Sequence, residues 1–166
     1  MTRCIAASIF RAKDRIIKNL DAQVNITIIN MKTHYINLKT KGNTDIINIT
    51  SYIEDIVNKE SIKDGLLFLQ VIGSTAALTT MEYEPGQKKD LKTLFDEIIP
   101  YRSDWEHNFT WSDDNGHSHL RSSLLKTNYF VPVTDGELDL GTWQQVVLVD
   151  FDTRPRQRKI VVKIIT

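Results

Sequence analysis

The sequence predicts a single compact domain of the α+β class, with a mixed, mostly antiparallel β-sheet and a few helices. Stretches with strand periodicity outnumber those with helical periodicity, and helices do not alternate strictly with strands, which argues against a doubly wound fold. The chain has 166 residues and a hydrophobic content of 41%, enough for one core of ordinary size. It shows no internal repeat and no low-complexity linker, so we expect one domain over 23–166.

The first 22 residues differ from the rest in charge. Five basic side chains and one acidic side chain, Asp14, are interspersed with apolar residues over 1–20. This composition resembles a basic amphipathic or transit segment, but it lacks a small-residue cleavage pattern and the apolar block of a signal peptide. We therefore interpret residues 1–22 as a basic N-terminal extension of the domain.

Four strands are predicted in the first half of the chain. Residues 24–30 and 34–40 alternate apolar and polar side chains with period two, as half-buried strands do. A turn at 41–43 leads to a further short strand at 45–49. The near-continuous apolar run at 66–72 is typical of a central strand that is buried on both faces.

Three helices are predicted. The first spans 50–59 and is capped by Thr50 or Ser51. The second spans 85–98, with one proline in its first turn and another shortly after its end. A third, short helix is expected over 119–126.

The end of the chain has strand character again. Asp135-Gly136 is a strong signal for a tight hairpin turn. Strands are predicted at 128–133, 137–140, 145–151 and 158–165.

Composition excludes several classes of function. The 21 basic and 21 acidic residues cancel, so no overall field attracts nucleic acid or anionic lipid. No apolar run approaches the roughly 20 residues that cross a bilayer. The single cysteine, Cys4, excludes an intramolecular disulfide and favours a reducing compartment. We expect a cytoplasmic protein with neither a nucleic-acid partner nor a membrane partner.

The most unusual stretch is 113–121, which reads Asp-Asp-Asn-Gly-His-Ser-His-Leu-Arg. Three of the four histidines, His107, His117 and His119, lie in or beside it. Packing alone does not explain such a density of metal-binding and proton-transfer groups. We expect a functional site here.

Several motifs follow one another in a fixed order: Gly73-Ser74-Thr75-Ala76-Ala77-Leu78-Thr79-Thr80, Glu82, His107, His119 to Leu125, Val131-Pro132-Val133, Gly136 and Leu140-Gly141-Thr142-Trp143-Gln144. Taken together, they resemble the YjbQ-type family of secondary thiamine-phosphate synthases over roughly 32–166. The resemblance implies an α+β chain that assembles as a homotrimer. It also implies an activity that joins an aminopyrimidine diphosphate to a thiazole phosphate and releases pyrophosphate.

The sequence departs from this family at Gly73, where many members carry a histidine before the hydroxyl pair. Members with the Gly-Ser-Thr-Ala-Ala form commonly carry Asp-Asn-Gly-His-Ser-His as well, and this chain has both. We therefore hypothesise that His117 supplies the imidazole that is missing at Gly73.

A divalent-metal site is one interpretation of the histidines. A turn between His107 and His119 brings both imidazoles to one point, and Glu82 arrives from a strand–helix junction. Two imidazoles, one carboxylate and an open position are typical of a catalytic metal site for Zn or Mg. The same three residues are the candidates for acid–base catalysis. The alternative is that these groups hydrogen-bond one another and cap the next helix. Because His117 and His119 are two positions apart, they cannot share one helix face.

Other residues are predicted to hold a phosphorylated substrate. Ser74 and Thr75 follow a buried strand, where small hydroxyl residues let a phosphate approach the backbone. The arginines at 154, 156 and 158 project to one side of an extended segment, and we expect one of them on the substrate and the others on the surface or at subunit contacts. The predicted substrate contacts are Ser74, Thr75, Asp113, Asp114, Asn115, His117, Arg121, Thr142, Gln144 and Arg156.

Trp143 lies in a short polar segment just before an apolar strand. It could stack on a planar heterocycle, but we favour a place at a subunit interface.

The sequence therefore leaves two classes of function open. One is an enzyme acting on phosphorylated heterocycles, and the other is a trimeric protein that binds a small ligand or metal without relevant catalysis.

Overall fold

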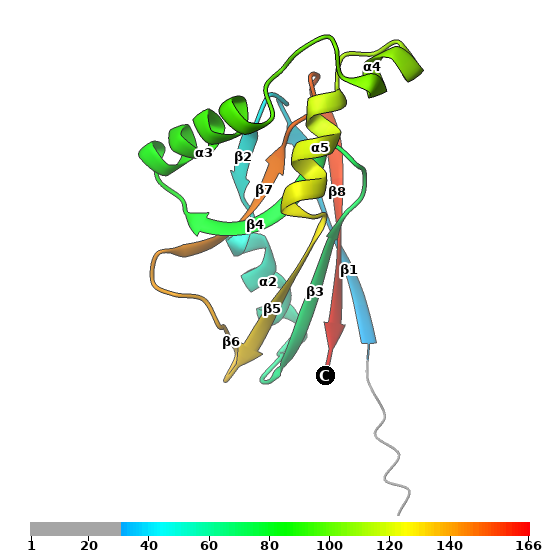
Figure 1. Cartoon of the computed structure of the whole chain (residues 1–166). Helices are drawn as coiled ribbons and strands as arrows, with labels where there is room; N and C mark the ends of the chain where they lie inside the picture. Colours follow the sequence, from blue (N-terminus) through cyan, green and yellow to red (C-terminus); the bar gives the residue numbers. More distant parts are fainter. Residues whose placement is uncertain (1–30) are drawn as a thin grey trace, which may run out of the picture.

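The computed structural model describes residues 31–166 (Figure 1). The expected basic extension at 1–22 and the expected strand at 24–30 lie outside the described residues. The described elements, in chain order, are β1 (Met31–Thr40), β2 (Asp45–Asn48), α2 (Thr50–Glu60), β3 (Gly65–Val71), β4 (Ala76–Glu82), α3 (Pro85–Ile98), α4 (Glu106–Trp111), α5 (Gly116–Leu125), β5 (Asn128–Thr134), β6 (Glu137–Leu138), β7 (Gln144–Asp150) and β8 (Arg156–Ile165).

The strands form two sheets, and every strand pair in the described part of the chain is antiparallel. The larger sheet has the order β1-β8-β3-β5-β6, and the smaller sheet has the order β2-β7-β4. The predicted α+β class with a mostly antiparallel arrangement is therefore confirmed. The predicted tight turn at Asp135-Gly136 joins β5 to β6, with φ angles of 52° and 89°, as a type I′ hairpin requires.

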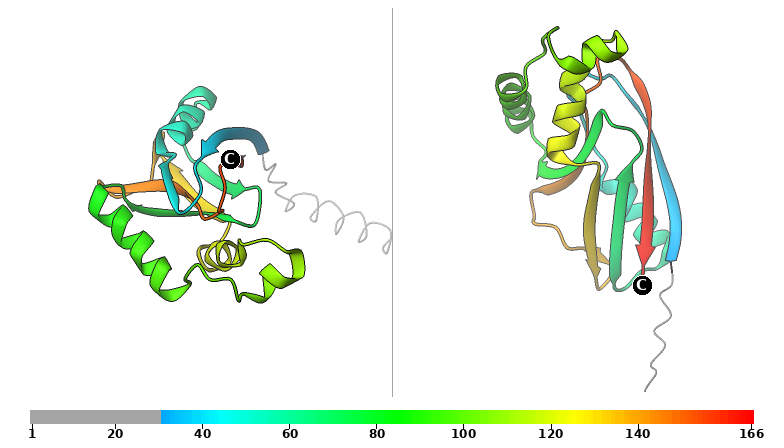
Figure 2. Two further views of the ribbon diagram at one scale, coloured as in Figure 1. Left: turned by 90° about the horizontal axis from the view of Figure 1, so that it is seen from above. Right: turned by 45° about the vertical axis from the view of Figure 1, so that its right-hand side comes forward.

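Two apolar clusters hold the layers together, and Figure 2 shows how the sheets and helices are arranged. The larger cluster lies between the two sheets and includes one face of α2. The second cluster lies on the other side of the smaller sheet, where Phe95 of α3 packs edge-on against Phe151. Strand β7 is consequently buried on both faces, because it lies between the two clusters.

The expectation that 66–72 is buried on both faces is wrong. Leu67, Leu69 and Val71 are fully buried against the larger cluster, but Phe68 on the opposite face is only partly covered. No other described element packs on that side of the larger sheet (Figure 2). We call this side the outer face.

Local signals account for the helix ends. At the start of α3 the side chain of Glu84 accepts hydrogen bonds from the backbone N–H groups of Gly86 and Gln87, which satisfies two otherwise unpaired donors. The predicted cap of α2 by Thr50 or Ser51 is wrong, because Asn48 accepts the Thr50 N–H instead. Within residues 31–166 no helix is long and apolar enough to cross a membrane.

Candidate functional site

The structure brings His107 and His119 together, and we call them the imidazole pair. His107 lies on α4 and His119 on α5, and their ring centroids are 4.3 Å apart. Asp113, in the loop between the two helices, places its Oδ1 3.6 Å from Nε2 of His107. Two imidazoles and a carboxylate therefore share one half-exposed surface.

The loop that presents the imidazole pair is fixed by buried hydrogen bonds. Asn108 donates to the backbone carbonyls of Arg102 and Ser103 and accepts the N–H of Gly116. A Cβ at position 116 would lie 2.8 Å from both Asn108 Oδ1 and Trp105 Cβ, so only glycine fits there. This contact explains why α5 begins at Gly116 rather than at the predicted residue 119.

The environment of His119 favours the neutral imidazole. Burial is the largest cause that lowers its pKa, and the neighbouring His107 lowers it further. Asp113, Asp152 and a hydrogen bond with the Ser74 backbone act in the opposite direction without reversing the shift. A neutral imidazole has a lone pair available, which suits it to accept a proton or to hold a ligand.

A group of buried charges lies beneath the Ser74 turn, and we call it the buried charge network. Arg158 donates to both carboxylate oxygens of Asp150, at 2.7 and 2.6 Å. Thr75 donates to Asp152 and accepts from Arg158. Asp150 also accepts the hydroxyl of Thr40 at 2.5 Å. All five side chains are buried, so the network is satisfied internally.

This network corrects the prediction for the arginine strip. Arg158 is buried in an ion pair rather than exposed at a strand edge, because its position on β8 faces the interior. Arg156 is half-exposed and pairs with Asp152 at 2.9 Å. Burial raises the pKa of the Asp152 carboxyl, but hydrogen bonds from Arg156 and Thr75 outweigh it and leave that pKa below its usual value. Asp113 and Asp152 influence the pKa of both Arg156 and His119, which indicates that Arg156 lies in the same region as the imidazole pair.

Glu82 does not join the imidazole pair within one chain. It is exposed at the end of β4, opposite Gln144, whereas Ala76 at the start of that strand adjoins the Ser74 turn. Six residue steps of about 3.3 Å separate the two ends by roughly 20 Å. The predicted convergence of Glu82 with His107 and His119 is therefore absent from the described part of this chain.

The residues around Gln144 gather at the Glu82 end of β4. Gln144 donates to Thr80 and accepts the N–H of Gly141. Thr142 and Trp143 are exposed, Trp143 by 71%. These residues form a separate surface, remote from the imidazole pair.

The predicted metal site has too few ligand side chains in the described part of the chain. Residues 31–166 contain no group of three or more His, Cys, Asp or Glu side chains that could hold a metal ion. The imidazole pair with Asp113 comes nearest to the predicted donor set. The residues present do not fit a resident Zn or Mg ion, so we derive no step through a metal.

Two further predicted residues, Asp114 and Arg121, have structural partners. Asp114 accepts from Thr153 and Tyr101, which ties the α4–α5 loop to its neighbours. Arg121 is buried and donates to the Ile99 carbonyl, to Thr44 and to Asp96, so it is not directed at solvent. Asn115 and His117 are also buried, and their Oδ1 and Nδ1 atoms have no partner among the described residues.

The hypothesis that His117 replaces an imidazole at Gly73 gains no support. His117 packs edge-on against Tyr101, with ring centroids 5.1 Å apart, and burial followed by the charge of Arg121 lowers its pKa. His119 is the imidazole beside the Ser74 turn. Gly73 has a φ of +124°, and a Cβ there would lie 3.0 Å from Nη1 of Arg158. The positive φ, together with the nearby Arg158 guanidinium, therefore accounts for glycine at this position.

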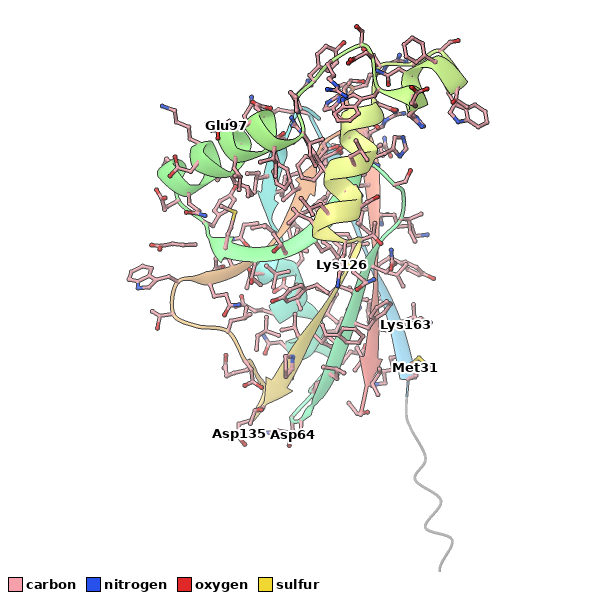
Figure 3. The ribbon with its side chains drawn as sticks, in the orientation of Figure 1. Met31, Asp64, Glu97, Lys126, Asp135 and Lys163 are labelled. Carbon is pink, nitrogen blue, oxygen red and sulfur yellow. The ribbon has the colours of Figure 1, made fainter. Side chains whose placement is uncertain are left out.

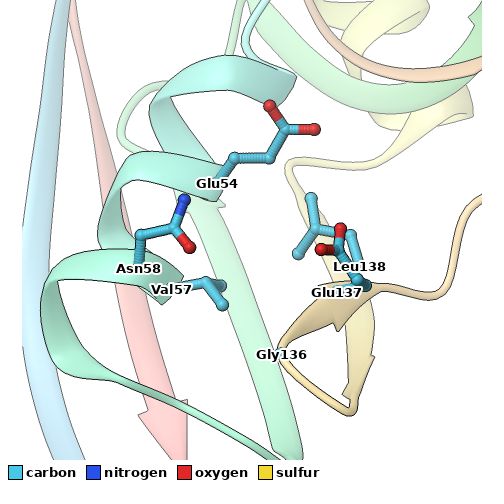
Figure 4. Close-up of a pocket in the computed structure, with 6 residues that line it drawn as sticks. All are labelled: Glu54, Val57, Asn58, Gly136, Glu137 and Leu138. Atoms are coloured by element: carbon cyan, nitrogen blue, oxygen red, sulfur yellow. The ribbon is translucent and has the colours of Figure 1, made fainter.

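One pocket lies far from all these residues (Figure 4). It has a volume of about 290 Å³ and lies between α2 and the β5–β6 hairpin, with Glu54 and Glu137 on its walls. None of the predicted site residues lines it. Its two carboxylates do not suit a phosphorylated ligand.

Proteins with similar sequences are found in archaea and bacteria. A sequence model described as "UPF0047 protein YjbQ-like" matches residues 34–166. A UPF0047 protein of Archaeoglobus fulgidus is 36% identical over 126 residues, which are 76% of this chain and 95% of that protein. The UPF0047 protein YugU of Bacillus subtilis is 33% identical over 128 residues, which are 76% of this chain and 93% of that protein.

Two solved structures of similar fold are described without a stated activity. A YbjQ-like protein of unknown function from Sulfolobus solfataricus is 34% identical, with a TM-score of 0.74 over 82% of this chain and 99% of that chain. A hypothetical protein from Aeropyrum pernix is 29% identical, with a TM-score of 0.73 over 79% of this chain and 96% of that chain. These matches agree with the α+β fold described above.

Proposed function

We propose that this chain, which belongs to the UPF0047 (YjbQ-like) family, binds a phosphorylated heterocycle beside the imidazole pair. The reaction we assign to it joins an aminopyrimidine diphosphate to a thiazole phosphate and releases pyrophosphate. The carbon–oxygen bond to the diphosphate breaks, and the same carbon forms a bond to the thiazole nitrogen. Pyrophosphate leaves with the electron pair of the broken bond.

The observation that carries this proposal is the close approach of His107 and His119, whose ring centroids are 4.3 Å apart. Asp113, which lies 3.6 Å from His107, also acts electrostatically on Arg156. A departing pyrophosphate requires hydrogen-bond donors and positive charge at the oxygens where negative charge develops. His119 is held neutral by burial and by His107, and the approach of an anion would favour its protonated, hydrogen-bond-donating form. Arg156 pairs with Asp152 but remains half-exposed, so its guanidinium can also donate hydrogen bonds to phosphate oxygens. The identity of the two precursors rests on the family resemblance.

Turnover of the two precursors tests the proposal. We expect His119→Ala to lower kcat/KM about 10²- to 10⁴-fold, the usual contribution of a positioned acid or base. A matched control is His34→Gln, because His34 lies on β1 and pairs with Glu60 at 3.0 Å, away from the site. The control should stay within about twofold of wild type, well below the acid–base contribution. Wild-type protein without turnover, or a His119→Ala variant as active as wild type, would overturn the proposal.

A second function, that of a homotrimer that binds a small ligand without relevant catalysis, is favoured by the outer face of the larger sheet. Tyr35, Phe130 and Ile72 are each more than half exposed there, and Phe68 stacks on Phe130 with ring centroids 5.0 Å apart. Exposed apolar side chains that gather on one face of a sheet favour an interaction site there. Self-association through this face would cover it. Ligand binding without turnover in wild-type protein would decide in favour of this second function.

A further inference from the structure

A polar pocket adjoins the imidazole pair at the Ser74 turn, and we call it the Lys126 pocket. It has a volume of about 420 Å³. It lies where the β3–β4 loop passes the end of α5 and the start of β5, and Figure 3 labels Lys126 at this junction. No carboxylate lines the pocket, whose residues are Gly73, Ser74, Ser122, Ser123, Lys126, Thr127 and Asn128.

The pocket offers donors that the fold does not use. The Ser122 hydroxyl is committed to the Ala76 carbonyl at 2.7 Å. The hydroxyls of Ser74, Ser123 and Thr127 have no hydrogen-bond partner within residues 31–166. Across the same part of the chain, no carboxylate lies within 4.0 Å of the Lys126 ammonium. The residues that line the pocket therefore carry three uncommitted hydroxyls and one cation, and no carboxylate is among them.

The backbone of Lys126 is held in a conformation that favours glycine. Its φ is 75° and its ψ is 155°, a region that residues with a side chain rarely occupy and that persists only when the surroundings impose it. Here the Lys126 N–H donates to the Ser122 carbonyl, and the Lys126 carbonyl accepts the Leu78 N–H. The chain thus carries a lysine where glycine would be less strained.

The pocket lies next to the imidazole pair. Ser74 lines the pocket, and its backbone lies close enough to His119 to act on the pKa of that imidazole. On the far side of the turn, the Arg158 guanidinium lies under Gly73. The last carbonyls of α5 add partial negative charge of about half a unit, which the full charge of Lys126 exceeds.

We infer that the Lys126 pocket binds a phosphoryl group, held by the Lys126 ammonium and the hydroxyls of Ser74 and Ser123. It is a second anion subsite of the same ligand whose reacting part lies at the imidazole pair. The inference depends on the proposed function for the identity of that ligand, but not for the binding of an anion.

Calorimetric titration of the full chain with inorganic phosphate and with pyrophosphate tests the subsite. We expect Lys126→Gln and Lys126→Gly to weaken pyrophosphate binding tenfold or more. Lys92→Gln is the matched control, because Lys92 is exposed on α3 away from the pocket, and it should stay within twofold. We also expect Lys126→Gly to raise the thermal unfolding midpoint, since glycine relieves the positive φ.

Several results would overturn the inference. Wild-type protein that binds neither anion at millimolar concentration excludes the subsite, as does a Lys126→Gln variant with wild-type affinity. If Lys126 only neutralised the end of α5, Lys126→Gly would lower the unfolding midpoint and leave anion affinity unchanged. Absence of precursor turnover together with Lys126-dependent pyrophosphate binding would refute the proposed function and leave the subsite standing. Turnover that depends on His119, with an unchanged KM in Lys126→Gln, would refute the subsite alone.

Discussion

Replacing Asp150 with asparagine should destabilise the protein strongly. Asp150 is fully buried and accepts two hydrogen bonds from Arg158, one from Thr40 and one from the Asp152 N–H. Asparagine keeps the shape but removes the charge and turns one acceptor into a donor. The guanidinium would retain only Asp152 Oδ2, at 3.6 Å, as a nearby carboxylate.

The expected loss is about 3–5 kcal/mol of unfolding free energy, the range for removing one partner of a buried ion pair. For a domain of this size, each kcal/mol lowers Tm by about 2–4 °C, so the total shift is roughly 6–20 °C. The assay is urea unfolding at fixed protomer concentration, because association of copies would add to the apparent stability. Asp104→Asn is the control, since Asp104 pairs with Arg102 on the surface, where such a pair contributes about 1 kcal/mol or less. A loss of less than about 1 kcal/mol in Asp150→Asn would refute the reasoning that the charges are buried and mutually dependent.

Two further predictions concern pH and association. Burial lowers the pKa of His117 in the folded chain, whereas a histidine in the unfolded chain has a pKa of about 6.5. Below that pH the unfolded state binds more protons than the folded state, so the free energy of unfolding decreases as the pH falls. His117→Phe should reduce this acid sensitivity by up to about 1.4 kcal/mol per pH unit, and an unchanged slope of unfolding free energy between pH 7 and 5 would contradict the assignment. Phe130→Asp places a charge on the outer face and should shift the mass measured by light scattering toward that of the monomer. The control is Leu94→Asp, at an exposed position on α3, which should leave the mass unchanged. Equal masses for both variants and the wild-type protein would argue against association through the outer face.

The fold was predictable wherever periodicity was strong. The strand at 34–40 and the helix at 85–98 match β1 and α3, because their apolar spacing and flanking prolines are local signals. Helix α4 was missed because its six residues carry no apolar periodicity. The burial of 66–72 was misjudged because an apolar run does not reveal whether a second layer covers it. Here the outer face is open within the described residues.

The site was predictable in part, since the density of histidines marked its place. The sequence could not show that β4 runs from the Ser74 turn away from the imidazole pair. This direction places Glu82 at the end of β4 that is remote from His107 and His119. It could not show that Arg158 pairs with Asp150, because these residues lie on strands of different sheets. Lys126 carries no signal for a positive φ, since that conformation follows from hydrogen bonds to Ser122 and Leu78.

The buried charge network fixes geometry more than it adds stability. Breaking such a network is costly, yet replacing all its members with apolar residues of similar volume is often neutral or stabilising, so net stability does not explain its presence. What the network does is hold Thr75 from two sides. It thereby orients the preceding Ser74, whose backbone acts on the pKa of His119 and which lines the Lys126 pocket. Donors that are fixed before a ligand arrives bind developing charge without reorganisation. Replacing both Asp150 and Arg158 with apolar residues should therefore recover the stability that Asp150→Asn loses, but it should not recover the pyrophosphate affinity.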